Sequence, residues 1–315
     1  MGEVSLSEGL KSRRRSAFRG VTVTAAVLGL LASGVVPASA VQNPDEQVVS
    51  LIERVAPNQG DVVGGTMAQG SVLVTSGAST VSIPEDPGAP ISIEAPNGTA
   101  MDVSLPVGLA LEDGQIASDG TVVYQSADDS VDSAVQTLND GSVRVQTIIR
   151  NQDAAHEFSY GLGSGFEPVE AFDGSISAVK ITEDGFEAFN VSEPWARDAT
   201  GKDIPTHYQI RGNDLVQVVM PAADTVYPVV ADPQWTWFAG GYGAKFNKRE
   251  TRNFASYGSA VAFCGVVPGT LKIACAIAGG SWFIQARTAS NSNQCIFLAA
   301  IPAPIAIRYT GSGCY

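Results

Sequence analysis

The chain has 315 residues, a formal net charge of −13 and a hydrophobic fraction of 44%. This length allows one or two domains with hydrophobic cores, and the low charged fraction of 16% excludes a highly charged disordered chain. The sequence has no P-loop, dinucleotide-binding fingerprint or H-E-x-x-H motif, so nothing in it indicates nucleotide-dependent or zinc-peptidase chemistry.

Residues 1–40 have the features of an export signal. A basic region with Lys11 and Arg13–Arg15 precedes VTVTAAVLGLLASGVV, an apolar run shorter than the roughly 20 residues of a transmembrane helix. The small residues of the sequence ASA end at Ala40, and we predict signal-peptidase cleavage after that residue. The mature protein is then secreted and extracellular. A retained anchor helix is the alternative.

The mature chain is expected to begin with a short helix in residues 41–57, because NPDEQVVSLIERVA places apolar residues near helical spacing and acids early. Residues 58–233 then alternate apolar with small or polar residues, as half-buried strands do. Hairpin turns are predicted at Asn139–Gly141, Asp184–Gly185 and Gly212–Asp214, whose residue types tolerate positive φ. About ten short strands at this spacing predict an antiparallel β-sandwich.

Charge divides the mature chain into two parts. Residues 41–233 contain 29 acidic and seven basic residues, a net charge of −22, whereas residues 234–315 carry +6 with Glu250 as their single acid. The segment YPVVADPQWTW, residues 227–237, marks the boundary, since the proline of Asp232-Pro233 stops strand pairing. This asymmetry bears on attraction between charged partners and not on the fold.

The sequence pattern of the C-terminal part, residues 234–315, predicts a small helical module. Residues 247–267 have the pattern of one helix, with Asn247 and Glu250 as a capping box, and Pro268-Gly269 ends it. A second helix in TLKIACAIAGGSWFIQART completes an αα-hairpin, and two strands follow around a Pro-Ala-Pro turn. The predicted fold class is α+β: an antiparallel β-sandwich domain followed by a disulfide-stapled αα-hairpin plus β-hairpin module.

All four cysteines lie in this module. An even number of cysteines in an exported chain predicts two disulfides, and four cysteines allow three pairings. The expected helical hairpin would bring Cys264 near Cys275, and the expected strand pair would bring Cys295 near Cys314, so we predict these two bridges. A metal site is the weaker alternative, because no histidine follows His207 and no C-x-x-C pair occurs.

Catalytic chemistry is not indicated by any motif. His156 and His207 lie on expected strands and favour structural roles over general-base catalysis. Glu167 and Glu170 in FEPVE could form a glycosidase-like pair, which leaves an extracellular carboxylate-dependent hydrolase open as an alternative. We predict a non-enzymatic protein with no catalytic residue and no cofactor.

The acidic segment SADDSVD raises the question of a metal site. Its carboxylates Asp128, Asp129 and Asp132 could contact Ca²⁺, but their spacing is not that of an EF-hand loop. We interpret the segment as a solvated loop and predict no metal site.

The basic module is the expected binding part. The sequence names no partner for it; an anionic membrane or a cell-envelope surface is the candidate, and nucleic acid is not expected. The candidate surface-binding residues are Trp235, Trp237, Lys245, Lys248, Arg249 and Arg252. The apolar stretch from Phe263 to Gln285, with Ile273, Ile277 and Ile284 among small residues, is interpreted as the core of the helical hairpin; membrane insertion is the alternative.

Two functions follow from this division. The first is an exported binding protein without enzymatic activity. The second is the precursor of a membrane-active, bacteriocin- or toxin-like effector, which the acidic domain restrains until cleavage near Pro233–Trp237 releases it.

The segments PWARDATGKDIPTHYQIRGNDLVQVV, YPVVADP and FNKRETRNFA resemble secreted proteins of actinobacteria. Those proteins pair a β-rich N-terminal region with a small, cysteine-bearing, helix-prone C-terminal region. The resemblance covers most of the mature chain and implies export and this architecture. No activity is established for that group, so the resemblance brings no catalytic residues with it.

Overall fold

The computed structural model describes residues 43–57, 60–77, 79–171, 173–183, 185–241, 243–300, 304–311 and 313–315. The predicted export signal and its cleavage after Ala40 lie outside the described residues, as does Asp184 of one predicted turn.

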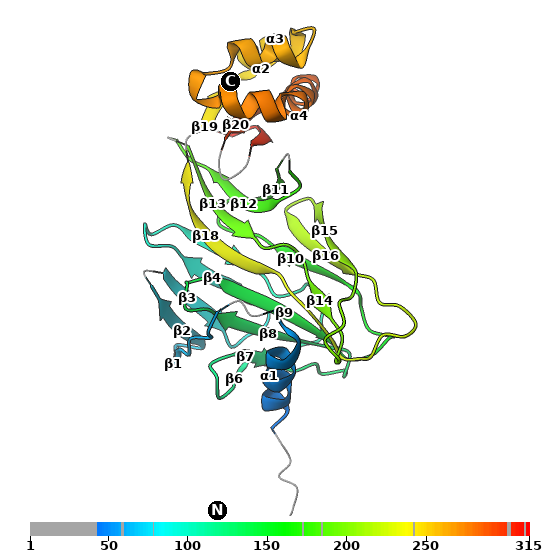
Figure 1. Cartoon of the computed structure of the whole chain (residues 1–315). Coiled ribbons are helices and arrows are strands. Elements are labelled where there is room, and N and C mark those ends of the chain that lie inside the picture. The colour runs from blue at the N-terminus through cyan, green and yellow to red at the C-terminus, as the bar shows by residue number, and fades with distance from the viewer. Residues whose placement is uncertain are drawn as a thin grey trace, which may run out of the picture. The chain divides into compact units, whose positions relative to one another are not determined.

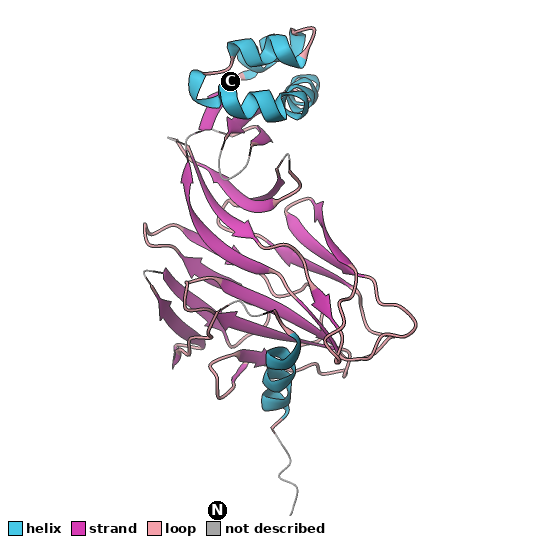
Figure 2. Cartoon of the chain, viewed as in Figure 1, coloured by secondary structure: helices cyan, strands magenta, loops and turns pink. Residues whose placement is uncertain are grey.

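The described part of the chain is mainly antiparallel β-sheet, followed by a small C-terminal region of helices and strands (Figures 1 and 2). The C-terminal region contains two disulfides and ends in a β-hairpin. The α+β class with sandwich-like sheets is therefore confirmed.

The expected N-terminal helix is α1 (Pro44–Val55). The side-chain oxygen of Asn43 accepts a hydrogen bond of 3.2 Å from the backbone N–H of Asp45, which satisfies one of the free donors at the helix start. The buried side chains of α1 form a cluster with Ala134 and Ile148 of the β-rich region.

The strands of the β-rich region form three antiparallel sheets within the described residues. The first contains β1 (Thr66–Ala68), β2 (Ser71–Ser76), β3 (Ser79–Pro84), β4 (Ile91–Glu94) and β5 (Ala100–Val103). The second has ten strands: β6 (Gln115–Ile116), β7 (Val122–Tyr124), β8 (Val131–Thr137), β9 (Val143–Ile149), β11 (Glu167–Glu170), β12 (Ile176–Ile181), β13 (Phe186–Val191), β14 (Ala196–Arg197), β17 (Val229–Ala231) and β18 (Gln234–Gly241). The third contains β10 (Glu157–Gly161), β15 (Thr206–Arg211) and β16 (Asp214–Val219).

One hydrophobic core joins the three sheets. Val72 of β2, Tyr124 of β7 and Phe158 of β10 are among its fully buried members. Two of the predicted hairpin turns are confirmed: β8 and β9 are joined through Asn139–Gly141, and β15 and β16 through Gly212, which has a φ of 67°.

The fold does not change where the charge changes. β18 follows Pro233 directly, pairs with β13 and β9, and so belongs to the ten-stranded sheet. The separate C-terminal fold begins with β19 at Gly243. Backbone pairing therefore continues past the proline, because Pro233 occupies the short gap between β17 and β18 and its carbonyl accepts from Val145 N–H at 2.9 Å.

The C-terminal module is defined here as residues 243–315. Its elements are β19 (Gly243–Phe246), α2 (Lys248–Ser256), α3 (Ala260–Val266), the 3₁₀ turn η1 (Gly269–Leu271), α4 (Lys272–Asn291), β20 (Cys295–Ala299) and β21 (Ile305–Tyr309). The prediction of one helix in residues 247–267 is wrong. Two helices form because Tyr257 is extended and the Ser259 hydroxyl accepts from the N–H of Ala262 at 3.3 Å, which starts a new helix.

The three strands of the module form a sheet with two buried faces. Ile296 and Leu298 pack against α2, α3 and α4, whereas Phe297 and Ile307 pack against β12 and β13 of the ten-stranded sheet. The ring of Phe297 lies edge-on to that of Phe186, with centroids 6.1 Å apart. The module thus has its own hydrophobic interior and is not threaded through the sandwich core.

Candidate binding surface

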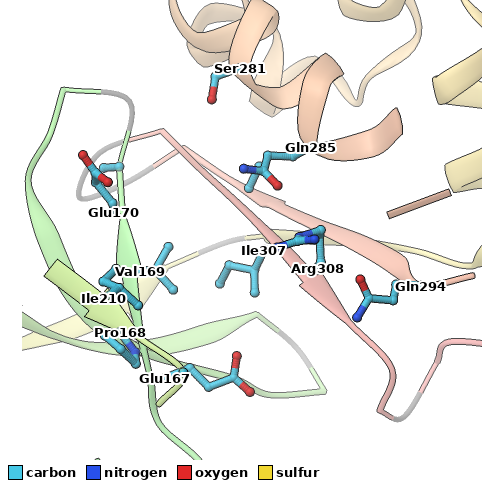
Figure 3. Close-up of a pocket in the computed structure, with 13 residues that line it drawn as sticks. Glu167, Pro168, Val169, Glu170, Ile210, Ser281, Gln285, Gln294, Ile307 and Arg308 are labelled. Atoms are coloured by element: carbon cyan, nitrogen blue, oxygen red, sulfur yellow. The ribbon is translucent and has the colours of Figure 1, made fainter. Parts of the chain in front are cut away.

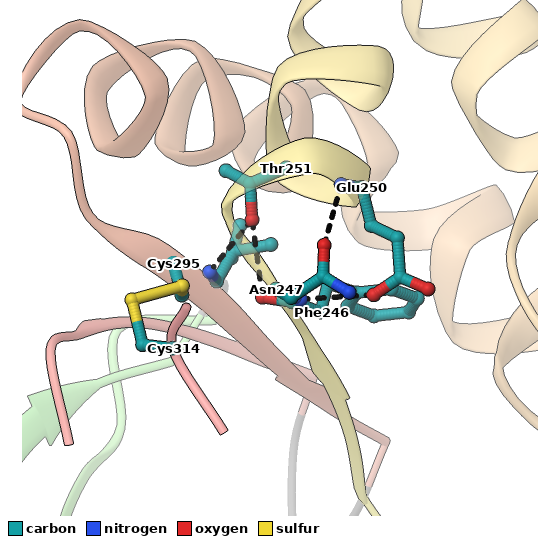
Figure 4. Close-up of a disulfide and its surroundings, with 7 residues drawn as sticks. Phe246, Asn247, Glu250, Thr251, Cys295 and Cys314 are labelled. Atoms are coloured by element: carbon teal, nitrogen blue, oxygen red, sulfur yellow. Dashed lines mark hydrogen bonds between the residues drawn. A yellow bond between two sulfur atoms is a disulfide. The ribbon is translucent and has the colours of Figure 1, made fainter. Parts of the chain in front are cut away.

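Both predicted disulfides are present: Cys264–Cys275, and Cys295–Cys314, which Figure 4 shows. Each joins Cα atoms 5.5 Å apart. The first links α3 to α4, and the second ties the start of β20 to the segment that follows β21. The helices and strands of the module are therefore held together covalently at two places.

Hydrogen bonds fix α2 to the module's sheet (Figure 4). The predicted capping box is confirmed: the N–H of Glu250 donates to the Asn247 side chain, and the Glu250 carboxylate accepts from the N–H of Asn247, both at 2.9 Å. The buried Thr251 hydroxyl donates to the carbonyl of Phe246 at 3.2 Å and accepts from the N–H of Ile296 at 3.1 Å. These bonds fix the position of the helix that carries most of the predicted surface cations.

The predicted surface-binding residues do not all reach the surface. Arg249 and Arg252 of α2 are exposed, and Lys245 and Lys248 are half-buried. The prediction for Trp235 is wrong, because its side chain is 1% exposed in the sandwich core.

Trp237, the other predicted tryptophan, is half-buried and packs edge-on against Phe189 with ring centroids 5.0 Å apart. Both tryptophans belong to β18, which the composition had assigned to the basic module. Their membership of the ten-stranded sheet explains why they are not free for binding.

The helices α3 and α4 expose a set of aliphatic side chains, most of which were predicted to lie in the core of the helical hairpin. We call this set the α3–α4 apolar face; it consists of Val261, Val266, Ile273, Ile277 and Ile284. Their exposed fractions are 83%, 46%, 79%, 61% and 63% respectively. With about 100° per residue, the three isoleucines fall on one stripe of α4.

The opposite stripe of α4 is also apolar. Ala274, Ala278 and Trp282 are buried there in the module's own core. A helix that is apolar on both sides normally has partners on both sides, yet none of the described residues covers the isoleucine stripe. The charged residues of α4 are the exposed Lys272 and Arg287, and neither α3 nor α4 contains an acidic residue.

Membrane-spanning helices are not found in the described part of the chain, where no helix is both long and apolar enough to cross a bilayer.

Glu167 and Glu170 line a single groove (Figure 3). The groove has a volume of about 700 Å³ and is bordered by β11, β21 and α4. The two carboxylates lie toward opposite ends of β11 and do not point toward each other (Figure 3). This arrangement does not favour the glycosidase-like pair, whose carboxyl groups must flank one bond of the substrate.

The carboxylates of SADDSVD are used within the protein. Asp128 accepts from the hydroxyls of Ser126 and Ser130, and these hydrogen bonds lower the pKa of its carboxyl group. The buried Asp132 forms an ion pair with Arg150 at 2.7 Å, although burial still raises the pKa of Asp132. Among the described residues, no group of three potential metal ligands comes together.

The two histidines have local partners. His156 lies 3.3 Å from the Tyr227 hydroxyl, and His207 lies 3.0 Å from the side-chain nitrogen of Gln209. The structure brings neither of them together with a nucleophile, as a catalytic arrangement would require.

A buried carboxyl group was missed by the sequence analysis. Asp232, in the segment YPVVADP, is 0% exposed; its Oδ1 accepts from the N–H of Trp195 at 3.0 Å and from the hydroxyl of Tyr208 at 3.4 Å. Burial raises the pKa of Asp232 to about 7, and the hydrogen bond from Trp195 offsets only part of that effect. The sequence did contain a signal for this buried carboxyl group: an acid next to a proline, between two apolar strands.

Comparison of the chain with models of known protein families gave no match, and a search of curated proteins gave none either.

Proposed function

We propose that this protein is an exported, non-enzymatic binding protein that attaches to an anionic membrane surface through its C-terminal module. The α3–α4 apolar face carries the proposal, because Ile273 and Ile277 are mostly exposed on a helix without acidic residues. Exposed apolar patches of this kind mark interaction sites. The two disulfides support export, since such bonds persist in oxidising compartments.

Charge favours a lipid surface over a second copy of the chain. Residues 234–315 carry a net charge of +6, and the cations nearest to the isoleucine stripe in the sequence are Lys272 and Arg287 of the same helix. A symmetric dimer through this face would bring these like charges together. Anionic headgroups would instead surround the stripe with opposite charge while the isoleucine side chains enter the acyl region.

Release of the module as a membrane-active effector is not favoured. Pro233 and Trp235 are buried, and β18 is paired with strands on both sides, so residues 233–237 themselves give a protease no exposed segment. The proposed protein therefore acts with its acidic β-rich region attached.

Vesicle cosedimentation tests the proposal. The oxidised full chain should bind vesicles that contain phosphatidylglycerol and bind weakly to vesicles of phosphatidylcholine alone. The double variant Ile273→Gln/Ile277→Gln should bind at least about tenfold more weakly, because burial of one such side chain is worth about 1.5–3 kcal/mol. Glutamine keeps helix propensity, so the fold of α4 should remain.

Val107→Gln is the matched control, because Val107 is 68% exposed and lies in the β-rich region. Its binding should equal that of the parent chain. Equal binding by the double variant would contradict the proposal, as would equal binding to both vesicle types. If the double variant instead converts a dimer into a monomer in light scattering, a second copy covers this face.

A further inference from the structure

Two unpaired sheet edges border the groove that contains Glu167 and Glu170. Among the described strands, β11 pairs with β12 alone and β21 pairs with β20 alone, so each is the last strand of its sheet. The two strands lie close together beside the groove but do not pair with each other (Figure 3). β21 has N–H and C=O groups along its free edge, whereas β11 contains Pro168, which has no N–H to donate.

The lining residues show that the groove follows these edges. Successive side chains of a strand point to opposite faces. The groove nevertheless contacts the consecutive residues Val169 and Glu170 of β11, and the consecutive residues Ile307 and Arg308 of β21. It therefore runs along the edges of these strands and not over one face of a sheet. A second cavity of about 560 Å³ shares Glu167, Ile307 and Arg308 with it and extends past Tyr309 to Gly311. The two cavities together run along β21.

The groove has polar side chains that remain available to a ligand. Six of them form no hydrogen bond or ion pair with another described residue: Glu167, Glu170, Ser281, Gln285, Gln294 and Arg308. Four acids elsewhere form ion pairs in the described structure; Glu157, for example, lies 2.6 Å from Arg211. In Figure 3 these groups are spread along the groove, with Glu167 and Glu170 toward the two ends of β11 and Arg308 on the facing strand.

We propose that this groove binds an extended peptide segment of a partner protein, which adds as a strand to the free edge of β21. Main-chain hydrogen bonds to the edge would supply affinity, and the charged side chains would supply specificity. The peptide carries basic side chains that face Glu167 and Glu170, about 10 Å apart along an extended strand, and an acidic group that faces Arg308.

The lining chemistry favours a peptide over a sugar. Among the described residues that line the two cavities, Tyr309 is the single aromatic one, so a sugar would find one ring to stack on. Amide groups of Gln285 and Gln294 are instead suited to pair with peptide groups. This groove borders α4 but shares no residue with the α3–α4 apolar face, so variants can test the two surfaces one at a time.

The experiment selects random linear peptides displayed on phage against the oxidised full chain. The most enriched peptide is synthesised together with an N-methylated form, which keeps the side chains but cannot donate main-chain hydrogen bonds. Fluorescence anisotropy then measures binding to the parent chain, to Glu167→Lys/Glu170→Lys and to Glu94→Lys. Glu94 is the matched control, an exposed strand glutamate outside the groove and without an ion pair in the described structure.

The selected peptide should have basic residues. Its affinity should fall at least tenfold with the double charge reversal and with N-methylation, and should be unchanged with Glu94→Lys. Hydrogen exchange of the amides of Ile305–Tyr309 should slow when the peptide binds. The proposal is overturned if no peptide is enriched over a bare support, if the double variant binds equally, or if exchange in β21 does not change. Binding of chitohexaose that depends on Glu167 and Glu170 would make the groove a sugar site instead.

Discussion

Asp232 connects parts of two sheets through one buried carboxyl group. Its Oδ1 accepts hydrogen bonds from Trp195, from Tyr208 of β15 and from the side-chain amide of Gln217 of β16, and its Oδ2 has no partner in the described structure. The positive charge of the buried Arg144 favours ionisation of the Asp232 carboxyl group. Burial of Asp232 opposes that ionisation more strongly. The protonated carboxyl is therefore the form that suits this site near and below neutral pH.

This pKa predicts how stability depends on pH. The folded pKa of Asp232 is about 7 and the unfolded pKa is 3.8, so the stabilising contribution is complete below pH 3.8 and is lost as pH rises through 7. At about 1.4 kcal/mol per pKa unit, the loss is on the order of 4 kcal/mol. Asp232→Asn cannot ionise, so its free energy of unfolding should fall less between these pH values.

Chemical denaturation at a series of pH values measures this difference. The exposed Asp113→Asn serves as control and should keep the pH profile of the parent chain. An unchanged profile in Asp232→Asn would show that Asp232 does not titrate in this range.

Two adjacent glycines of α4 should respond oppositely to alanine. A Cβ at Gly279 would lie 2.3 Å from the Sγ of Cys264, whereas a Cβ at Gly280 would meet nothing within 4 Å. Gly279→Ala should therefore cost about 1–3 kcal/mol through overpacking against the disulfide. Gly280→Ala should gain up to about 1 kcal/mol from helix propensity. Denaturant unfolding of the oxidised chain measures both, and changes of the same sign would contradict this account.

At the scale of single elements, local signals predicted the structure well. The capping box at Asn247 and the turn at Asn139–Gly141 are set by residues within a few positions of each other, so a sequence pattern can contain them. The two disulfides followed from the expected hairpins in the same way. The break between α2 and α3 was missed, because its signal, Ser259 as a cap, competes with an otherwise helical pattern.

The orientation of α4 could not be predicted from its pattern. Both sides of the helix are apolar, so periodicity does not say which side is buried. Ile273 and Ile277 were predicted to lie in the core, but the small residues Ala274 and Ala278 are buried instead. Small residues allow the close approach of α3 that Cys264–Cys275 requires, and the larger isoleucines remain outside.

The groove was also beyond sequence reasoning. Glu167 and Glu170 were noticed as a pair, but their surroundings come from β21 and α4, which lie more than a hundred residues later in the chain. That β11 and β21 are edge strands is a property of the sheet order, which local patterns do not encode.

At the scale of the whole molecule, composition located the charge boundary but not the structural one. Trp235 and Trp237 follow the change in charge and still belong to the ten-stranded sheet. The module and the sandwich are instead joined by a shared apolar contact, in which Phe297 and Ile307 pack with Val179 and Phe186. The two parts should therefore influence each other's stability.

Phe297 is the side chain through which this coupling can be measured. It is 0% exposed, its ring packs on Gly243, and it contacts Phe186 of β13. Phe297→Ala should destabilise the chain by about 3–5 kcal/mol. Hydrogen exchange should become faster both in β20 and in β12–β13, because the contact that joins them is lost.

Phe246→Ala is the matched comparison, since Phe246 packs on Phe254 inside the module with ring centroids 4.5 Å apart. It should accelerate exchange in β19 and α2 and leave β12–β13 unchanged. If Phe297→Ala also leaves β12–β13 unchanged, the module is stabilised by its own core and disulfides alone. Acceleration in both parts would instead show that the acidic sandwich stabilises the basic module through this contact, which is the physical link between the two oppositely charged halves.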